Sequence, residues 1–222
     1  MTTPKACLSW SSGKDCAFAL HVARQQGDVE ITQLLTTVNS HFDRVAMHGT
    51  RVEILRRQAE AVGLPLIEVP LPWPCSNEQY EALMAEATAD LTGRSICDMV
   101  FGDLYLEDIR AYRDQRMAEA GMTAHYPLWQ HPTDELARDM LDAGVEAHVA
   151  TVDLSKLDPS FSGRRWDAAF IGDLPDGIDP CGENGEFHTC VVNGPAFREP
   201  LRIETGETVI RDGFAYTDLH LI

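Results

Sequence analysis

Strand-like and helix-like segments alternate over the first two-thirds of this 222-residue chain, and the alternation limits the folds it can adopt. Short apolar or β-branched runs predict strands at 6–10, 31–38, 65–71, 97–103 and 123–129. A segment of helical character follows each run, at 14–25, 51–63, 77–91, 107–121 and 133–144. Such alternation is typical of a parallel sheet covered by helices on both faces. We therefore predict a doubly wound α/β fold with a parallel sheet of about five strands.

The C-terminal third has a different pattern. The segment 146–155 still predicts a strand, but glycine, proline and acidic residues cluster from Pro159 onward. Later runs show the alternation and glycine turns expected of antiparallel strands, at 188–194, 201–213 and 214–222. We predict an N-terminal α/β domain over 1–127 and a smaller C-terminal α+β subdomain over 128–222.

The net charge of −17, from 18 Lys and Arg against 35 Asp and Glu, restricts the partners. So acidic a surface repels a phosphate backbone, and we expect neither broad nucleic-acid binding nor membrane binding. A small phosphate ligand can still bind at a helix N-terminus. The beginning of the chain lacks the apolar core of a signal peptide, and the six cysteines form no C-x-x-C pair. We expect a cytoplasmic protein with reduced thiols.

The segment LSWSSGKDCAFAL (8–20) places serines, a glycine and Lys14 between the first strand and the first helix. Ligands of open α/β sheets bind at the carboxyl ends of strands, and helix-start N–H groups with a lysine favour phosphate. The segment is not a P-loop of the G-x-x-x-x-G-K-[ST] kind, because Leu8 stands at the first glycine position and Asp15 follows the lysine. The alternative is a serine-rich helix cap with Lys14 on the surface.

The same segment resembles the S-G-G-K-D-S signature of the PP-loop ATP pyrophosphatases, with Ser12 for the first glycine and Cys16 for the last serine. Further segments resemble blocks of the diphthine–ammonia ligase family, namely MHGT (47–50), FGDLYLEDIRAYR (101–113), YPLW (126–129) and DPCGENGEFHTCVVNGPAF (179–197). They follow in order over nearly the whole chain. The resemblance implies a Rossmann-like fold of the HUP type.

What the resemblance implies chemically is ATP-dependent amide formation. A substrate carboxylate attacks the α-phosphate of ATP, pyrophosphate leaves, and ammonia displaces AMP. The implied ligands are ATP, Mg²⁺, ammonia and a carboxylate substrate, either diphthine on an elongation factor or an unknown small molecule. Asp15 is the implied Mg²⁺ ligand, since it is the nearest carboxylate in the loop. No covalent enzyme nucleophile is needed, because positioning and electrostatics can supply the rate.

The resemblance also implies site residues. The residues expected to contact the nucleotide are Ser9, Ser11, Ser12, Gly13, Lys14, Asp15, Cys16, Thr37, His48, Gly49, Gly102 and Asp103. Those expected to contact the acceptor substrate are Asp103, Arg113, Glu183, Glu186 and His188. The expected catalytic residues are Lys14, Asp15, Glu183 and Glu186.

Charge pattern alone gives a different interpretation of 101–116. Arg110, Arg113 and Arg116 recur every third residue, and acidic neighbours can pair with all three on a solvated helix face. Asp103 would then cap a loop. The resemblance favours a binding role for Asp103 and Arg113, since arginine binds carboxylate or phosphate bidentately, but it does not favour one for Arg116.

The loop containing Glu183 and Glu186 has two interpretations as well. As a site, it would turn both carboxylates to the acceptor substrate, because two carboxylates beside a triphosphate would repel it. There they would bind a cationic group or take a proton from ammonia. The alternative is a polar turn on an acidic surface, with Cys181 as a small structural residue.

Two functions of other classes remain open from the sequence. A nucleotide-binding sensor could keep the fold without adenylating anything, but it would have no use for Glu183 and Glu186. A PP-loop enzyme of tRNA modification is disfavoured by the net charge and the missing cysteine pairs. The oligomeric state is open as well, with a homodimer as one option.

Overall fold

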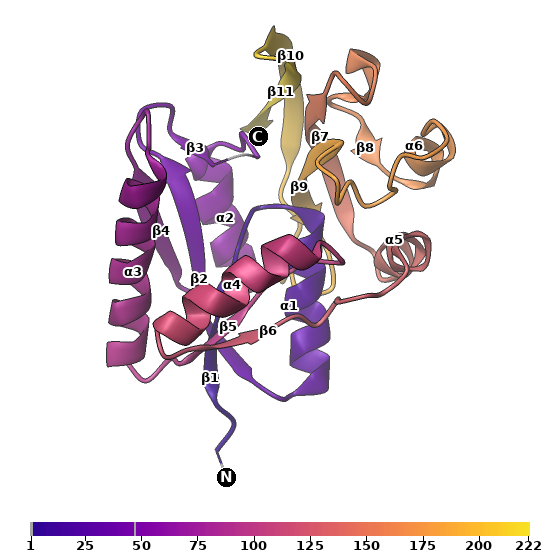
Figure 1. The fold of residues 1–222 in the computed structure, drawn as a ribbon. Coiled ribbons are helices and arrows are strands. Elements are labelled where there is room, and N and C mark those ends of the chain that lie inside the picture. The colour runs from indigo at the N-terminus through magenta and orange to yellow at the C-terminus, as the bar shows by residue number, and fades with distance from the viewer. Residues whose placement is uncertain (1, 47) are drawn as a thin grey trace.

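The computed structural model describes residues 2–46 and 48–222 and contains two sheets, of six and five strands (Figure 1). The strands of the first sheet are β1 (Lys5–Ser9), β2 (Glu30–Asn39), β3 (Arg44–Val45), β4 (Leu66–Leu71), β5 (Asp98–Val100) and β6 (Thr123–His125). The helices between these strands are α1 (Lys14–Gln26), α2 (Val52–Val62), α3 (Asn77–Gly93) and α4 (Glu107–Glu119), and α5 (Thr133–Asp142) follows β6. No helix in the described part has the length and apolarity needed to cross a membrane.

The first sheet is parallel except for β3, with the order β4–β2–β1–β5–β6. Successive side chains of a strand point to opposite faces. On one face, Leu8 of β1 packs in a cluster with residues of α1 and α2. On the other, Cys7 packs with Leu91 of α3 and Met117 of α4. The predicted doubly wound α/β fold is therefore confirmed, while the two-residue strand β3, antiparallel to β2, was not predicted.

The second sheet is antiparallel and contains β7 (Glu146–Asp153), β8 (Arg165–Trp166), β9 (Phe187–Asn193), β10 (Ile203–Arg211) and β11 (Phe214–Leu221). Strand β7 pairs with β8, β9 and β11, and β10 forms a hairpin with β11. The antiparallel tail is confirmed. Strand β8 and the short helix α6 (Ala168–Gly172) were not predicted.

The two sheets share one hydrophobic core. A single cluster contains Leu8 of β1 and Phe18 of α1 together with Val149 of β7 and Phe187 of β9. Helix α5 connects the last strand of the first sheet, β6, to the first strand of the second sheet, β7. The predicted domain boundary between residues 127 and 128 stays a prediction. The hydrophobic cluster continues across it, so packing alone does not mark where one domain ends.

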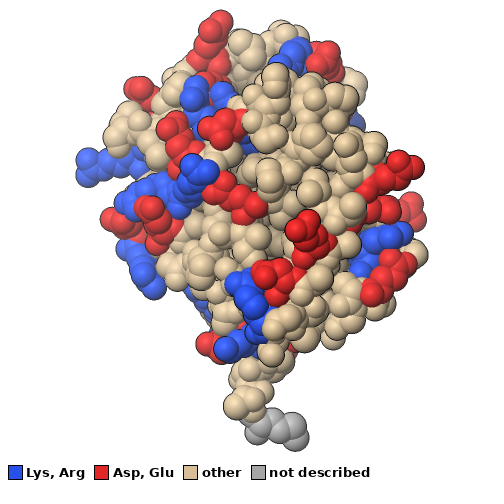
Figure 2. Space-filling view, turned by 90° about the vertical axis from the view of Figure 1, so that its left-hand side faces the viewer, with Lys and Arg blue, Asp and Glu red and all other residues tan. Residues whose placement is uncertain are grey.

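Charges of both signs cover the side of the molecule on which α3 lies. Figure 2 shows basic and acidic side chains next to one another there, around a broad uncharged area. Ion pairs of this kind join Arg94 to Asp90 at 3.2 Å and Arg116 to Glu81 at 3.7 Å. The excess of acidic residues therefore does not make a continuous negative surface on this side.

Candidate active site

The loop between β1 and α1 has an unusual backbone. Ser12 is fully buried and has a φ of +74°, in the left-handed region that favours glycine. Gly13 follows it, and a Cβ there would stand 3.0 Å from the His48 imidazole. The serine at the signature's first glycine position thus keeps a backbone conformation that a glycine would adopt more readily.

A cavity of about 600 Å³ opens at the carboxyl ends of β1, β2 and β5 and continues between α3 and α4. Its size suits a small-molecule ligand. The expected site residues that line it are Ser9, Ser11, Thr37, His48 and Arg113. Arg116 also lines it, although the sequence did not favour a role for this residue. The remaining expected residues lie outside the cavity wall.

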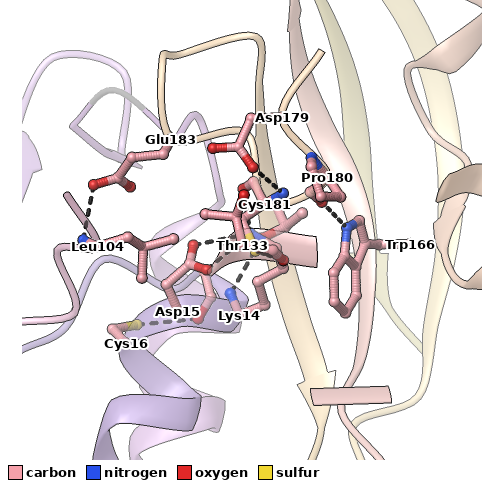
Figure 3. A network of polar contacts seen from close by, with 12 residues as sticks. Lys14, Asp15, Cys16, Leu104, Thr133, Trp166, Asp179, Pro180, Cys181 and Glu183 are labelled. Atoms are coloured by element: carbon pink, nitrogen blue, oxygen red, sulfur yellow. Dashed lines mark hydrogen bonds and ion pairs between the residues drawn. The ribbon is translucent and has the colours of Figure 1, made fainter. Parts of the chain in front are cut away.

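Lys14 is buried, so the alternative of a surface lysine is wrong. Its ammonium group donates to Asp15 at 2.9 Å and to the backbone carbonyl of Cys181 (Figure 3). The aromatic rings of Trp166 and Phe187 lie 5.3 and 5.7 Å from the same nitrogen. Burial alone would lower the Lys14 pKa, but Asp15, Cys181 and Asp179 together outweigh burial and raise that pKa.

The start of α1 is bonded to the second sheet. The backbone N–H of Lys14 donates to the Thr189 hydroxyl of β9 at 3.1 Å. The Cys16 thiol donates to the Gly13 carbonyl at 3.1 Å, and burial raises the pKa of this thiol to about 11. The cysteine at the signature's last position is therefore a neutral group turned toward its own helix start.

Gly102 and Asp103 follow β5 at the same edge of the sheet. A Cβ on Gly102 would stand 3.0 Å from the backbone of Asp15 and Cys16, so any other residue would crowd this close approach. The Asp103 carboxylate forms an ion pair with Arg113 at 2.8 Å. Arg113 also stacks on the ring of Phe101, 4.5 Å away, which fixes the guanidinium at the cavity.

The acidic loop of residues 179–186 contacts the segment after β5. Asp179 accepts a hydrogen bond from the Tyr105 hydroxyl at 2.9 Å, and Glu183 accepts one from the backbone N–H of Leu104 at 2.8 Å. Burial, with the nearby negative charges of Asp15 and Asp103, raises the pKa of Glu183 to about 7. Glu183 can therefore gain or lose a proton near neutral pH.

Glu186 lies inside this loop and is only 2% exposed. One of its carboxylate oxygens accepts a hydrogen bond from the Asn184 side chain at 3.0 Å and another from the Asp179 backbone N–H at 3.4 Å. The other oxygen, Oε2, is buried and has no hydrogen-bond partner among the residues that the structure describes. The two glutamates thus have different surroundings, and the alternative of a solvated polar turn is wrong for Glu186.

His48 and His188 meet beside the loop, with ring centroids 4.8 Å apart. The Nδ1–H of His48 donates to the Thr189 carbonyl at 3.3 Å. Burial lowers the pKa of His48 to about 4 and that of His188 to about 3. Both rings are therefore neutral at pH 7, and neither supplies a positive charge for a phosphate.

Three residues at this site were not found from the sequence. Asp179 and Tyr105 belong to the loops just described, and Gln58 of α2 hydrogen-bonds to the loop after β1. Gln58 carried a usable signal, because it occupies the apolar face of a predicted amphipathic helix. A polar side chain at such a position is buried and needs hydrogen-bond partners.

A mainly parallel α/β sheet with a cavity at its carboxyl edge, bordered by a serine- and glycine-containing loop at the first strand–helix turn, is an architecture of the Rossmann-like PP-loop class. Comparison with known proteins agrees. The family model described as the diphthamide synthase N-terminal domain matches residues 4–124, and that of the diphthamide synthase C-terminal domain matches residues 132–220. The chain belongs to the diphthamide synthase family.

Similar proteins include two named diphthine–ammonia ligase. The one from Homo sapiens is 30% identical over 107 residues, covering 42% of this chain and 40% of that protein. The one from Schizosaccharomyces pombe is 23% identical over 221 residues, covering 90% of this chain and 36% of that protein. The matches thus span well under half the length of these relatives.

Proposed function

We propose that this chain is an ATP-dependent amide ligase that converts a substrate carboxylate into an amide and releases AMP and pyrophosphate. The observation that carries the proposal is the cavity of about 600 Å³ whose wall includes Ser9 and Ser11, directly before the start of α1. Family membership and the names of the similar proteins support the same activity. Diphthine on an elongation factor is the first acceptor to test, and a small carboxylate is the second.

In this proposal the adenosine part of ATP occupies the cavity beside Thr37 and His48, and the phosphates lie over residues 11–16. Backbone N–H groups at a helix start favour phosphate, and the Arg113 guanidinium at the cavity adds positive charge. Lys14 would contact a phosphate oxygen after its ammonium group turns from the Cys181 carbonyl. This reorientation is part of the proposal.

Mg²⁺ fits the proposed site through Asp15. The ion usually binds one or two carboxylates together with phosphate oxygens and water, and the Asp15 side chain is 26% exposed. Residues 2–46 and 48–222 contain no group of three acidic, histidine or cysteine side chains that would hold a metal ion by itself. When bound, Mg²⁺ would neutralise the charge that develops on the leaving pyrophosphate.

The acceptor half of the reaction is assigned to Asp103, Arg113, Glu183, Glu186 and His188. Ammonia attacks the acyl carbon, the bond to AMP breaks, and the nitrogen gives up a proton. Glu183 is the proposed base, because a pKa of about 7 suits proton transfer at neutral pH. All six cysteines are free thiols, as expected of the cytoplasm that we propose as its location.

The test is to incubate the protein with ATP, Mg²⁺, ammonium and either an elongation factor carrying diphthine or a set of small carboxylates. We expect AMP and pyrophosphate in equal amounts, together with an amide detected by mass. Omitting ammonium should abolish the amide. ADP as the main product would indicate a kinase or ATPase, and ATP binding without turnover on any acceptor would indicate a sensor.

A further inference from the structure

The side-chain amide of Gln58 is fully buried and joins three segments that are distant in the sequence. Its Oε1 accepts a hydrogen bond from the Trp10 indole N–H at 3.0 Å. Its Nε2 donates to the carbonyl oxygens of Ser12 at 3.1 Å and Val191 at 2.6 Å. The orientation of the amide is fixed by these partners, because an indole N–H can only donate and a carbonyl can only accept.

The bond to Ser12 holds the residue with the unfavourable backbone. The Ser12 carbonyl accepts from the Gln58 amide and also from the Val191 N–H at 2.9 Å. A left-handed conformation is disfavoured for a residue with a Cβ, so it persists only where its surroundings impose it. Two hydrogen bonds to one carbonyl are such a constraint, since that carbonyl would turn away if Ser12 relaxed.

Gln58 acts from behind the loop. Trp10 and Ser11 line the cavity, whereas Gln58 does not. The amide thus contacts the loop from α2 and from outside the wall of the cavity. Resting on the proposed function, we infer that Gln58 is a positioning residue of the nucleotide site: it keeps Ser12 left-handed and thereby gives residues 11–16 the shape that binds ATP phosphates.

A merely structural role is the competing explanation, because Gln58 also attaches α2 to β9 through Val191. The two explanations differ in how Gln58 and Ser12 interact. Glycine adopts the left-handed conformation without the penalty of a Cβ, so a glycine at position 12 needs less support from Gln58. A positioning role therefore predicts that Ser12→Gly restores what a Gln58 variant loses in ATP binding, whereas a structural role predicts no such rescue.

The experiment measures ATP affinity by calorimetry, and stability by urea denaturation, in four proteins. These are the wild-type chain, Gln58→Met, Ser12→Gly and the double variant. Methionine keeps the volume of Gln58 and removes its hydrogen bonds. We expect Gln58→Met to lower ATP affinity at least tenfold relative to wild type. The double variant should bind ATP at least fivefold more tightly than Gln58→Met, while its free energy of unfolding stays as low as that of Gln58→Met.

The same glycine in the wild-type chain should not raise the affinity, because Ser12 already has the required conformation there. Gln33→Met is the matched control, since Gln33 is also buried but belongs to β2 and lies outside the cavity. If Gln58→Met does not fold, Gln58→Leu replaces it, because leucine also removes these hydrogen bonds and, unlike glutamate, places no charge at this buried position. Equal effects of Ser12→Gly in both backgrounds would overturn the inference.

Hydrogen exchange separates a failure of this inference from a failure of the proposed function, because it needs no ATP. The Lys14 N–H is bonded to Thr189 and the Val191 N–H to Ser12, so both report on the loop. We expect Gln58→Met to speed exchange of these amides at least tenfold and Ser12→Gly to slow it again. Unchanged exchange would overturn the positioning role even if the wild-type protein binds ATP. A third outcome is that Ser12→Gly slows exchange again in the Gln58→Met background although the wild-type protein binds no ATP. Gln58 would then shape the loop without serving a nucleotide, which would overturn the inference.

Discussion

The ammonium group of Lys14 donates a hydrogen bond to the backbone carbonyl of Cys181, 167 positions later in the chain. The bond joins the loop after β1 to the acidic loop of residues 179–186. The Trp166 ring lies 5.3 Å from the same ammonium nitrogen, and its indole N–H donates to the Pro180 carbonyl of the acidic loop at 2.9 Å. The proposed ATP half and the proposed acceptor half of the site are therefore in direct contact through one buried cation.

We predict that Lys14→Met weakens both ATP binding and the fold. A buried lysine that loses its charge leaves the Asp15 carboxylate without a partner, which we expect to cost about 2 kcal/mol of unfolding free energy because Asp15 is partly solvated. ATP affinity should fall about tenfold or more, since a charge-assisted hydrogen bond contributes about 1.5–3 kcal/mol. Calorimetry and urea denaturation measure the two effects, with the exposed Lys5→Met as control. Wild-type ATP affinity in Lys14→Met would remove Lys14 from the nucleotide site.

Most of the fold was predictable because its signals are local. The alternation of strands and helices in the first two-thirds follows from apolar runs and helical periodicity, which depend on neighbouring residues. Strand β8 and helix α6 were missed because each is short and lies in a segment rich in turn residues. Strand β8 also depends on its pairing with β7, and Phe170 of α6 packs into the core, so contacts with distant residues contribute to both.

The site was less predictable, because its geometry depends on residues far apart in the chain. The sequence located the loop after β1 but not the direction of Lys14, which the Cys181 carbonyl and the ring of Trp166 determine. It located Glu186 but did not predict its burial within its own loop. The departure at position 12 was visible, whereas its positive φ was not.

The raised pKa of Glu183 predicts a pH dependence of folding stability. Burial raises this pKa from an ordinary 4.5 to about 7, so the folded protein binds the proton more tightly than the unfolded chain. The contribution of Glu183 to stability is therefore full below about pH 4.5 and decreases as the pH rises to about 7. Glu183→Gln should be more stable than wild type at pH 8 by about 2 kcal/mol, with the difference shrinking toward pH 5. Urea denaturation at four pH values checks this, with the exposed Glu78→Gln as control, and a constant difference would contradict it.

Asp218 of β11 predicts the opposite pH dependence. Burial acts to raise its pKa, but hydrogen bonds from Arg51 and Arg44 outweigh burial and hold this pKa well below its ordinary value of 3.8. The stability that Asp218 contributes is therefore present above about pH 4 and is lost as the pH falls further. Asp218→Asn should cost about 2 kcal/mol at pH 7 and less at pH 3.

Asp218→Asn should also loosen the segment that contains His48, because Arg44, a partner of Asp218, donates to the Gly49 carbonyl next to His48. Urea denaturation at pH 7 and pH 3 measures the loss, and Asp212→Asn, exposed in the turn between β10 and β11, is the matched control. An equal loss at both pH values would show that shape, not charge, accounts for the role of Asp218.

The two oxygens of Glu186 predict a variant that separates ATP binding from amide formation. Glu186→Gln keeps an oxygen that accepts from Asn184 and replaces Oε2, which has no partner among the described residues, with an NH₂ group. We therefore expect the free energy of unfolding to change by less than about 1 kcal/mol. ATP affinity should stay within about threefold, because Glu186 does not line the cavity. Amide formation should fall about a hundredfold, because the acceptor half would lose one of its two glutamates while Glu183 remains as the proposed base. The measurement pairs ATP titration with product mass spectrometry, and the exposed Asp176→Asn serves as control. A variant that loses ATP binding but still forms the amide at saturating ATP would assign Glu186 to the nucleotide, because a carboxylate needed only by the acceptor has no reason to affect ATP affinity.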